Sequence, residues 1–282
     1  MVRVYSYKVS ESPHLLVSGA IHGDEICGPL AIERLRQQIE SGSLYLQNGC
    51  LTLIPICNPE AHRRNVRYID KNLNRVFCKH SKPTCYEERL ANLLLPYFDQ
   101  ADYLLDIHSF DAVGDPFIFQ DHSDPKDKAF AEALGVSPIF TNWVEMYHEL
   151  KSDASCTTDY VHANGIPGLT LECGQHRDPH APEVGYQAIQ RALVYLKMAD
   201  LSLQPQASSP RRVRMQSVHF RRHEKDRFAK DWKHLTPVQS GELIATYEDG
   251  TQIAAPKDGF VVLPKATARV GDEWVYFGTP EA

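Results

Sequence analysis

The chain has 282 residues, of which 43% are hydrophobic and 23% are charged, and its formal net charge is −6 at pH 7. This length suits one large domain or a medium domain with a small one, and the composition is ordinary for a soluble globular protein. The negative net charge gives no electrostatic reason to expect nucleic acid or an anionic membrane as a partner. No stretch approaches the roughly 20 apolar residues of a membrane helix, and residues 1–11 lack the apolar segment of a signal peptide.

The seven cysteines are odd in number and are scattered without CxxC spacing. This pattern indicates reduced thiols rather than a disulfide framework. Because reduced thiols are typical of the cytosol, we expect a cytoplasmic protein.

The first predicted elements are two strands. Residues 2–8 alternate in character, as in an edge strand, and residues 15–21 form an apolar run with small residues. Such a run is typical of a buried strand in a sheet that is covered on both faces. This strand leads into a Gly-containing turn that carries His22, Asp24 and Glu25. In open α/β sheets, the carboxyl end of a buried strand is a usual place for a site.

His22 and Glu25 are three residues apart, so both side chains can reach one point if the turn continues into a helix. An imidazole nitrogen and a carboxylate oxygen suit Zn²⁺, and two histidines with one glutamate leave a coordination position for water. A second apolar strand ends at His108, which supplies the third ligand of the predicted zinc triad.

Each of these features also has an ordinary structural explanation, since most such turns are solvated and a histidine after an apolar run often only caps a strand. A third strand, however, carries the carboxylate of Glu172 at its end. Three buried strands that each deliver a ligand or a base are hard to explain by packing alone. Asp106 is predicted on the same strand face as His108, where it either orients the imidazole or caps the strand.

Strand and helix patterns alternate along the rest of the first 200 residues. They predict strands over 50–59, 103–109, 115–120 and 165–174, and helices over 28–40, 84–99, 124–135 and 183–199, the second of which closes near Pro96. We expect a long irregular connection over 60–80 and substrate-facing loops over 141–165. In those loops, His148, Asp159 and His162 are candidate contacts.

The last part of the chain has a different character. Residues 202–212 are rich in Pro, Ser and Gln and mark a boundary, so we predict a first domain over 1–204 and a second over 205–282. The second contains short strand patterns with Gly-bearing turns, which predict a small all-β barrel or sandwich. It is similar in part to a lipoyl- or biotinyl-type barrel, but it lacks the hairpin of a carrier lysine, and Lys257 is expected in a surface turn.

Several short motifs together resemble one known family. They are HGDE at 22–25, NP at 58–59, RY at 67–68, NLNR at 72–75, DIHS at 106–109 and TLECG at 170–174. Their order and approximate spacing resemble the succinylglutamate desuccinylase/aspartoacylase family, a branch of the zinc carboxypeptidase-like fold, over roughly residues 14–200. The resemblance implies an α/β fold with a mixed central sheet flanked by helices, and one zinc ion per chain on His22, Glu25 and His108.

The same resemblance implies roles for residues in the basic connection. Arg67 is expected to polarise the scissile carbonyl, whereas Asn74 and Arg75 bind a carboxylate of the substrate. The family usually has Asp where this chain has Asn72, which we expect to weaken the anchoring of the loop or of a neighbouring arginine. The family can also place a substrate-contacting tyrosine near the position of Tyr276, but the local match favours a core or strand-surface residue.

The sequence therefore predicts a zinc-dependent amidohydrolase that cleaves the amide bond of an N-acyl amino acid or a similar small carboxylate-bearing molecule. Glu172 would act as the general base. One alternative is a zinc carboxypeptidase acting on short peptides, which a C-terminal region folded over the cleft would disfavour. Another is a non-catalytic zinc or ligand-binding protein, which the presence of Glu172 disfavours. Between residues 152 and 171 there is no arginine, so a pocket for a dianionic product is not expected.

Overall fold

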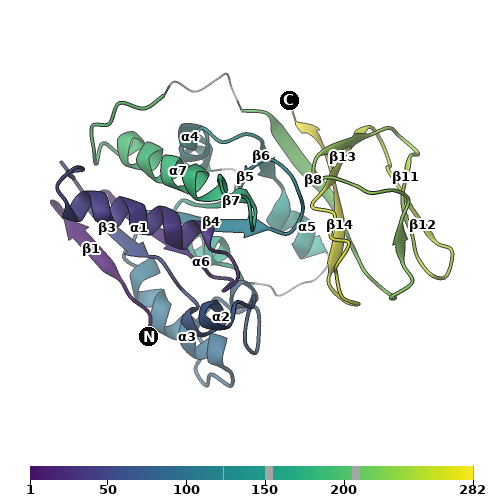
Figure 1. Cartoon of the computed structure of the whole chain (residues 1–282), viewed down its shortest axis with the longest axis horizontal. Coiled ribbons are helices and arrows are strands. Elements are labelled where there is room, and N and C mark those ends of the chain that lie inside the picture. Colours follow the sequence, from purple (N-terminus) through teal and green to yellow (C-terminus); the bar gives the residue numbers. More distant parts are fainter. Residues whose placement is uncertain (123, 150–154, 205–209, 282) are drawn as a thin grey trace.

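The computed structural model describes residues 1–122, 124–149, 155–204 and 210–281 (Figure 1). Its helices are α1 (Cys27–Glu40), α2 (Pro59–Arg64), the 3₁₀ turn η1 (Leu73–Arg75), α3 (Tyr86–Phe98), α4 (Pro125–Leu134), α5 (Trp143–Glu149), α6 (Thr157–Ala163) and α7 (Ala181–Tyr195). Its first strands are β1 (Tyr5–Lys8), β2 (His14–Gly19), β3 (Cys50–Ile54), β4 (Tyr103–Phe110), β5 (Phe117–Phe119), β6 (Ile139–Thr141) and β7 (Gly168–Gln175). The C-terminal strands are β8 (Arg212–Phe220), β9 (Arg227–Phe228), β10 (Thr236–Val238), β11 (Leu243–Thr246), β12 (Gln252–Ala254), β13 (Gly259–Val262) and β14 (Glu273–Glu281).

The central sheet is mixed, as predicted. Its strand order is β1-β3-β2-β4-β7-β5-β6-β8-β14-β13-β10. The strands from β3 to β7 in this order are parallel, whereas β1 and β5 pair antiparallel with their neighbours β3 and β7. Every residue of β2 and β3 is buried, which explains why these strands read as continuous apolar runs.

Helices cover both faces of this sheet, which confirms the predicted α/β architecture (Figure 1). One hydrophobic core lies between the sheet and the helices α1, α4 and α7, and a second lies between the opposite face and α3 with α6. Helix α1 packs very closely on the sheet, because a Cβ on Gly28 would lie 3.0 Å from the Cα of Gly19. This close approach fixes the position of the turn between Gly19 and Gly28, which carries His22 and Glu25, at the end of β2.

The register of the parallel strands brings their carboxyl ends together. Gly19 of β2 lies beside Ile107 of β4, and His108 of β4 lies beside Glu172 of β7. Because β2 ends at Gly19, the turn that follows it lies at the same edge of the sheet as these two residues. The fold therefore collects the predicted site residues from segments far apart in the sequence.

The C-terminal region, shown on the right of Figure 1, consists of strands in its described part. Strands β8, β14, β13 and β10 continue the central sheet, because β8 pairs in parallel with β6, while β9, β11 and β12 form a separate sheet. A cluster of buried side chains includes Phe117 and Phe140 of the first region and Val213 and Tyr276 of the second. The predicted domain boundary at 204/205 adjoins residues outside the described part, and the division into two domains stays a prediction.

Three local predictions need correction. Helix α3 continues past Pro96 to Phe98, because the buried side chains of Leu95 and Phe98 hold both sides of the proline against the core. The connection over 60–80 contains α2 and η1, and the expected loops over 141–165 contain α5 and α6. These short helices have too few residues to show a clear apolar period. The side chain of His148 lies outside the described part.

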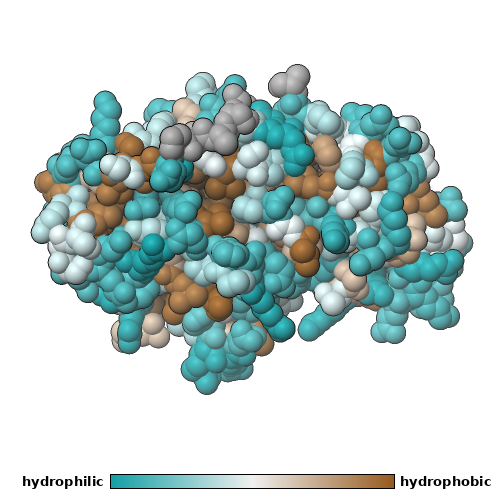
Figure 2. All heavy atoms as spheres, turned by 45° about the horizontal axis from the view of Figure 1, so that its top comes forward, coloured by the Kyte–Doolittle hydropathy of each residue, from teal (hydrophilic) through white to brown (hydrophobic). Residues whose placement is uncertain are grey.

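No helix in the described part of the chain has the length and apolarity to cross a membrane. The face shown in Figure 2 is mainly hydrophilic, with hydrophobic side chains in scattered patches. All seven cysteines lie in described segments, and all are free.

Candidate active site

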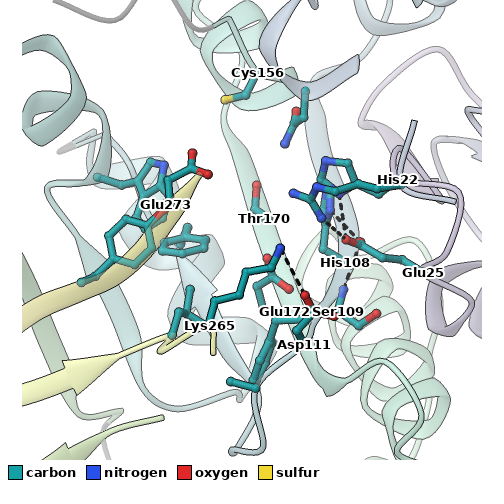
Figure 3. A pocket seen from close by; sticks show the side chains of 18 of the residues that line it. His22, Glu25, His108, Ser109, Asp111, Cys156, Thr170, Glu172, Lys265 and Glu273 are labelled. Carbon is teal, nitrogen blue, oxygen red and sulfur yellow. Dashed lines mark hydrogen bonds and ion pairs between the residues drawn. The ribbon is translucent and has the colours of Figure 1, made fainter. Parts of the chain in front are cut away.

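His22, Glu25 and His108 meet at the carboxyl edge of the sheet (Figure 3). The Nδ1 atom of His22 lies 2.8 Å from Glu25 Oε1, and the Nδ1 atom of His108 lies 2.9 Å from Glu25 Oε2. Their potential ligand atoms all lie within 4.8 Å of one another, and all three residues are buried. The turn that positions His22 requires Gly23, because a Cβ there would lie 2.2 Å from the carbonyl carbon of Ala61.

Each imidazole is also held on its other nitrogen. His22 Nε2 donates to Asn72 Oδ1 over 3.0 Å, and His108 Nε2 donates to Asp106 Oδ2 over 2.9 Å. Asp106 is fixed in turn by the hydroxyl of Ser18 at 2.7 Å. These contacts orient both rings so that Nδ1 faces Glu25, which is the arrangement that holds metal-binding histidines in proteins.

Asn72 has a more direct role than the predicted anchoring of the loop or an arginine. Its Oδ1 accepts from His22 Nε2 and also from the backbone N–H of Asn74. An amide oxygen keeps the geometry of a carboxylate oxygen here but brings no negative charge.

Burial and neighbouring charges set the protonation of this group. Burial lowers the pKa of His22 to about 4, and the charge of Arg67 adds to this effect. Burial alone would raise the pKa of Glu25, but the adjacent imidazoles of His22 and His108 hold it well below its usual range. Burial likewise opposes protonation of His108, yet Asp106 and Glu25 raise its pKa well above the ordinary value. A neutral His22 and an ionised Glu25 are the forms that bind a metal ion, whereas His108 would have to release a proton when the metal binds.

Glu172 lies beside this group and has a different environment. Its Oε2 atom is buried and has no hydrogen-bond partner among the described residues. Burial raises the pKa of Glu172 to about 7, with His108 opposing the rise and the charge of Glu25 adding to it. Arg67 reaches the same place, where its Nη1 donates to Glu25 Oε1 over 3.2 Å while the side chain stays partly exposed.

The predicted carboxylate-binding pair is placed beside the pocket. Asn74 Oδ1 accepts from the backbone N–H of Thr157 over 3.0 Å, which leaves the amide nitrogen as its donor. The guanidinium of Arg75 already has a partner, because its Nη2 donates to Glu273 Oε1 over 3.1 Å. Burial opposes ionisation of Glu273, but the charge of Arg75 keeps the pKa of Glu273 below its usual value. Sequence reasoning missed Glu273, since no local motif marks it.

The C-terminal region forms one side of the pocket. We call Lys265, Glu273 and Tyr276 the C-terminal wall, and His22, Glu25, His108 and Glu172 the sheet wall. The two walls face each other across a cavity of about 150 Å³ (Figure 3). Tyr276 is a core residue, as the sequence favoured, but it also lines the pocket, and its hydroxyl lies 2.7 Å from that of Tyr147.

Three linked polar residues of the pocket, Ser109, Asp111 and His176, were not predicted. Ser109 Oγ lies 2.8 Å from His176 Nδ1, and His176 Nε2 lies 3.1 Å from Asp111 Oδ1. Asp111 Oδ2 in turn lies 3.2 Å from Lys265 Nζ of the C-terminal wall. A signal was present in the sequence, because Ser109 directly follows His108 and His176 follows Glu172 at the end of the same strand.

Known proteins resemble this chain in sequence and in fold. A model of the Succinylglutamate desuccinylase/Aspartoacylase catalytic domain family matches residues 11–195. The succinylglutamate desuccinylase of Vibrio vulnificus (strain CMCP6) is 24% identical over 279 residues, which cover 93% of this chain and 79% of that enzyme.

Solved structures match over almost the whole chain. A succinylglutamate desuccinylase/aspartoacylase from Rhodobacter sphaeroides has a TM-score of 0.79 at 20% identity, covering 100% of this chain and 89% of that one. The product-bound ectoine utilization protein EutE (DoeB) from Ruegeria pomeroyi has a TM-score of 0.78 at 21% identity, covering 98% of this chain and 88% of that one. At these identities, the structural matches show a shared fold.

Proposed function

Since the chain belongs to the succinylglutamate desuccinylase/aspartoacylase family, we propose that it is a zinc-dependent amidohydrolase. Its proposed substrate is an N-acyl amino acid or a similar small molecule that bears a carboxylate. The observation that carries this proposal is the meeting of two imidazoles and a carboxylate beside Glu172, whose buried Oε2 atom has no partner among the described residues.

The donor set fits one Zn²⁺ per chain. Two Nδ1 atoms and a carboxylate converge, and both imidazoles are fixed on their other nitrogen, by Asn72 and by Asp106. Three protein ligands of this kind are typical of catalytic zinc sites, which keep one position open. Bound zinc supplies Lewis acidity, which makes water a competent nucleophile near neutral pH and polarises a carbonyl.

The chain's own residues supply proton transfer and charge stabilisation. Glu172 would accept a proton from the attacking water and deliver it to the leaving nitrogen, and a pKa of about 7 suits both steps at neutral pH. Arg67 would donate to the oxygen of the scissile carbonyl as negative charge develops there. Asn74 Nδ2 and the Arg75 guanidinium would hold the substrate carboxylate by charge-assisted hydrogen bonds. The products are a carboxylic acid and a free amine.

The shape of the pocket supports a small substrate over a peptide. The C-terminal wall stands opposite the sheet wall, and the cavity of about 150 Å³ between them is small. A carboxypeptidase would need the same metal ligands but more room for the chain before the scissile bond. A non-catalytic zinc or ligand-binding role would give no reason to keep the Glu172 oxygen without a partner.

A screen of N-acyl amino acids with zinc-loaded protein tests the proposal. Release of the free amine is measured for acetyl, succinyl and longer acyl groups, and short peptides are included in the panel. We expect release from at least one N-acyl amino acid, and loss of that release with Glu172→Gln. Hydrolysis of peptides alone would replace the proposal with the carboxypeptidase function.

A further inference from the structure

Asp121 is a buried carboxylate in the same pocket that the proposed reaction does not use. Only 5% of the residue is exposed, yet it lines the cavity. Its Oδ1 atom is buried and has no hydrogen-bond partner among the described residues, and its Oδ2 accepts only a long bond of 3.4 Å from Thr158 Oγ1. Because a buried carboxylate without partners is costly, this atom marks a place for a donor from outside the chain.

The pocket connects Asp121 with the sheet wall along one face of the sheet. Glu172 and Thr170 point to the same face of β7, since side chains alternate along a strand. Phe119 of β5 lies beside Thr170, and Asp121 follows Phe119 by two residues. Glu172, Thr170, Phe119 and Asp121 all line the cavity. A molecule held at the sheet wall can therefore reach Asp121 past Thr170.

The charge around Asp121 is negative. Burial raises the pKa of Asp121 to about 8, and the charges of Asp159 and Glu145 add to the effect. Burial also raises the pKa of the Cys156 thiol well above its ordinary value, with Asp159 and Asp121 contributing. Asp159 itself has one buried oxygen, Oδ1, without a partner among the described residues. Neighbouring carboxylates therefore raise the pKa values of both Asp121 and Cys156.

Cations elsewhere in the pocket have acidic partners. Arg75 pairs with Glu273, Lys265 with Asp111, and Arg67 with Glu25. A second carboxylate on a substrate would therefore add negative charge beside Asp159 and Glu145, whose charges already act on Asp121, and like charges disfavour binding. A protonated amine would instead bring donors to the unpartnered oxygen and favour the ionised form of Asp121, because a nearby cation lowers the pKa of a carboxyl group.

We propose that Asp121 forms a subsite for a protonated amine of the substrate, so that the amine product is a diamino acid. The inference rests on the proposed function. We place the ammonium on the amino-acid half of the substrate, which also carries the carboxylate. The reason is that the carboxylate-binding Asn74 and the subsite at Asp121 contact two consecutive residues. The backbone of Thr157 holds Asn74, and the hydroxyl of Thr158 contacts Asp121.

Three substrates of similar length test the subsite in the wild-type, zinc-loaded protein. They are Nα-acetylornithine with an ammonium, Nα-acetylnorvaline with a neutral chain, and Nα-acetylglutamate with a second carboxylate. We expect kcat/KM for the ornithine derivative to exceed that of the other two by about tenfold or more, as charge-assisted hydrogen bonds predict. Equal values, or a preference for the neutral or anionic substrate, would overturn the proposal without any variant.

Asp121→Asn removes the charge and nearly keeps the shape. It should remove the preference for the ornithine derivative, so that the kcat/KM values of the ornithine and norvaline derivatives agree within about twofold. Asp231→Asn, which removes an exposed carboxylate of the C-terminal region, is the matched control and should change neither value. An equal loss on both substrates would assign Asp121 a structural role and contradict the subsite.

Calorimetric binding of the free amino acids separates this inference from the proposed function. Ornithine should bind the zinc-loaded wild type about tenfold more tightly than norvaline, and Asp121→Asn should abolish the difference. If no N-acyl amino acid is hydrolysed but this difference is found, the proposed function fails and the subsite stands. If hydrolysis occurs but ornithine has no advantage in binding, the subsite fails and the proposed function stands.

Discussion

The two walls of the pocket are built in different ways. The sheet wall consists of side chains toward the carboxyl ends of hydrogen-bonded parallel strands and in the turn after β2. His22, Glu25 and His108 are buried, and Glu172 is partly buried. The C-terminal wall is tied to the other side of the pocket mainly by side-chain contacts, such as Arg75 with Glu273 and Tyr147 with Tyr276. Catalysis needs fixed geometry, so we assign the chemical step to the sheet wall. The C-terminal wall is suited to substrate selection.

Metal binding is the most sensitive test of the sheet wall. Wild-type protein purified without chelator should contain about one zinc ion per chain, and His22→Ala or His108→Ala should lose it, because two protein ligands hold zinc poorly. Metal analysis of each variant measures this. His223→Ala removes an exposed histidine of the C-terminal region and should keep the zinc. Unchanged zinc content in both triad variants would exclude the assigned ligands.

Glu172→Gln tests the chemistry of the same wall without removing a ligand. We expect the variant to keep its fold and zinc content but to lose about 10²–10⁴-fold in kcat, which is the usual contribution of general acid–base catalysis. Steady-state kinetics on a substrate from the screen measures the loss. A wild-type rate would show that the proton is transferred by another group.

Arg75 and Glu273 test the selection assigned to the C-terminal wall. Arg75→Lys should lower kcat/KM for carboxylate substrates by about tenfold, because a single ammonium does not replace a guanidinium fork. Amides of the same N-acyl amino acids should be poor substrates of the wild type and little changed in the variant. Glu273→Gln frees the guanidinium and should raise kcat/KM for Nα-acetylglutamate by about tenfold. Effects of equal size on acids and amides would remove Arg75 from carboxylate binding.

His234 tests how the two regions are joined. It is buried against the rings of Phe110 and Phe117, and its Nδ1 accepts from the backbone N–H of Leu263. Burial lowers its pKa to about 3, with Arg211 contributing. As the pH falls, His234 is therefore protonated in the unfolded chain before it is protonated in the folded chain. The free energy of unfolding is highest above pH 6.5 and decreases as the pH falls toward 3.

The slope of stability against pH measures this effect. Below pH 6.5, the wild type should lose about 1.4 kcal/mol per pH unit more than His234→Gln, which keeps an acceptor for Leu263. Urea unfolding at several pH values between 7 and 4 gives the comparison. Parallel slopes for the two proteins would show that His234 is protonated without cost in the folded state.

Much of the α/β region follows from local sequence. Continuous apolar runs predicted β2, β3, β4 and β7, since strands covered on both faces have no polar side. The helices α1, α4 and α7 were found for the complementary reason, because each has one apolar face. The short helices α5 and α6 were missed, and so was the continuation of the central sheet into β8. Strand pairing between distant segments leaves no local pattern.

The same division applies to the pocket. The sequence by itself placed His22 and Glu25 in the turn after a buried strand, because the apolar run before them indicates that strand. It also placed His108 and Glu172 late in two further strands, although β4 continues to Phe110 and β7 to Gln175. Only the tertiary structure decided that Glu273 pairs with Arg75 and that Asp121 lines the same cavity. These contacts depend on strand order and register, which long-range packing sets. The sequence around a residue contains no local pattern that identifies a partner distant in the chain.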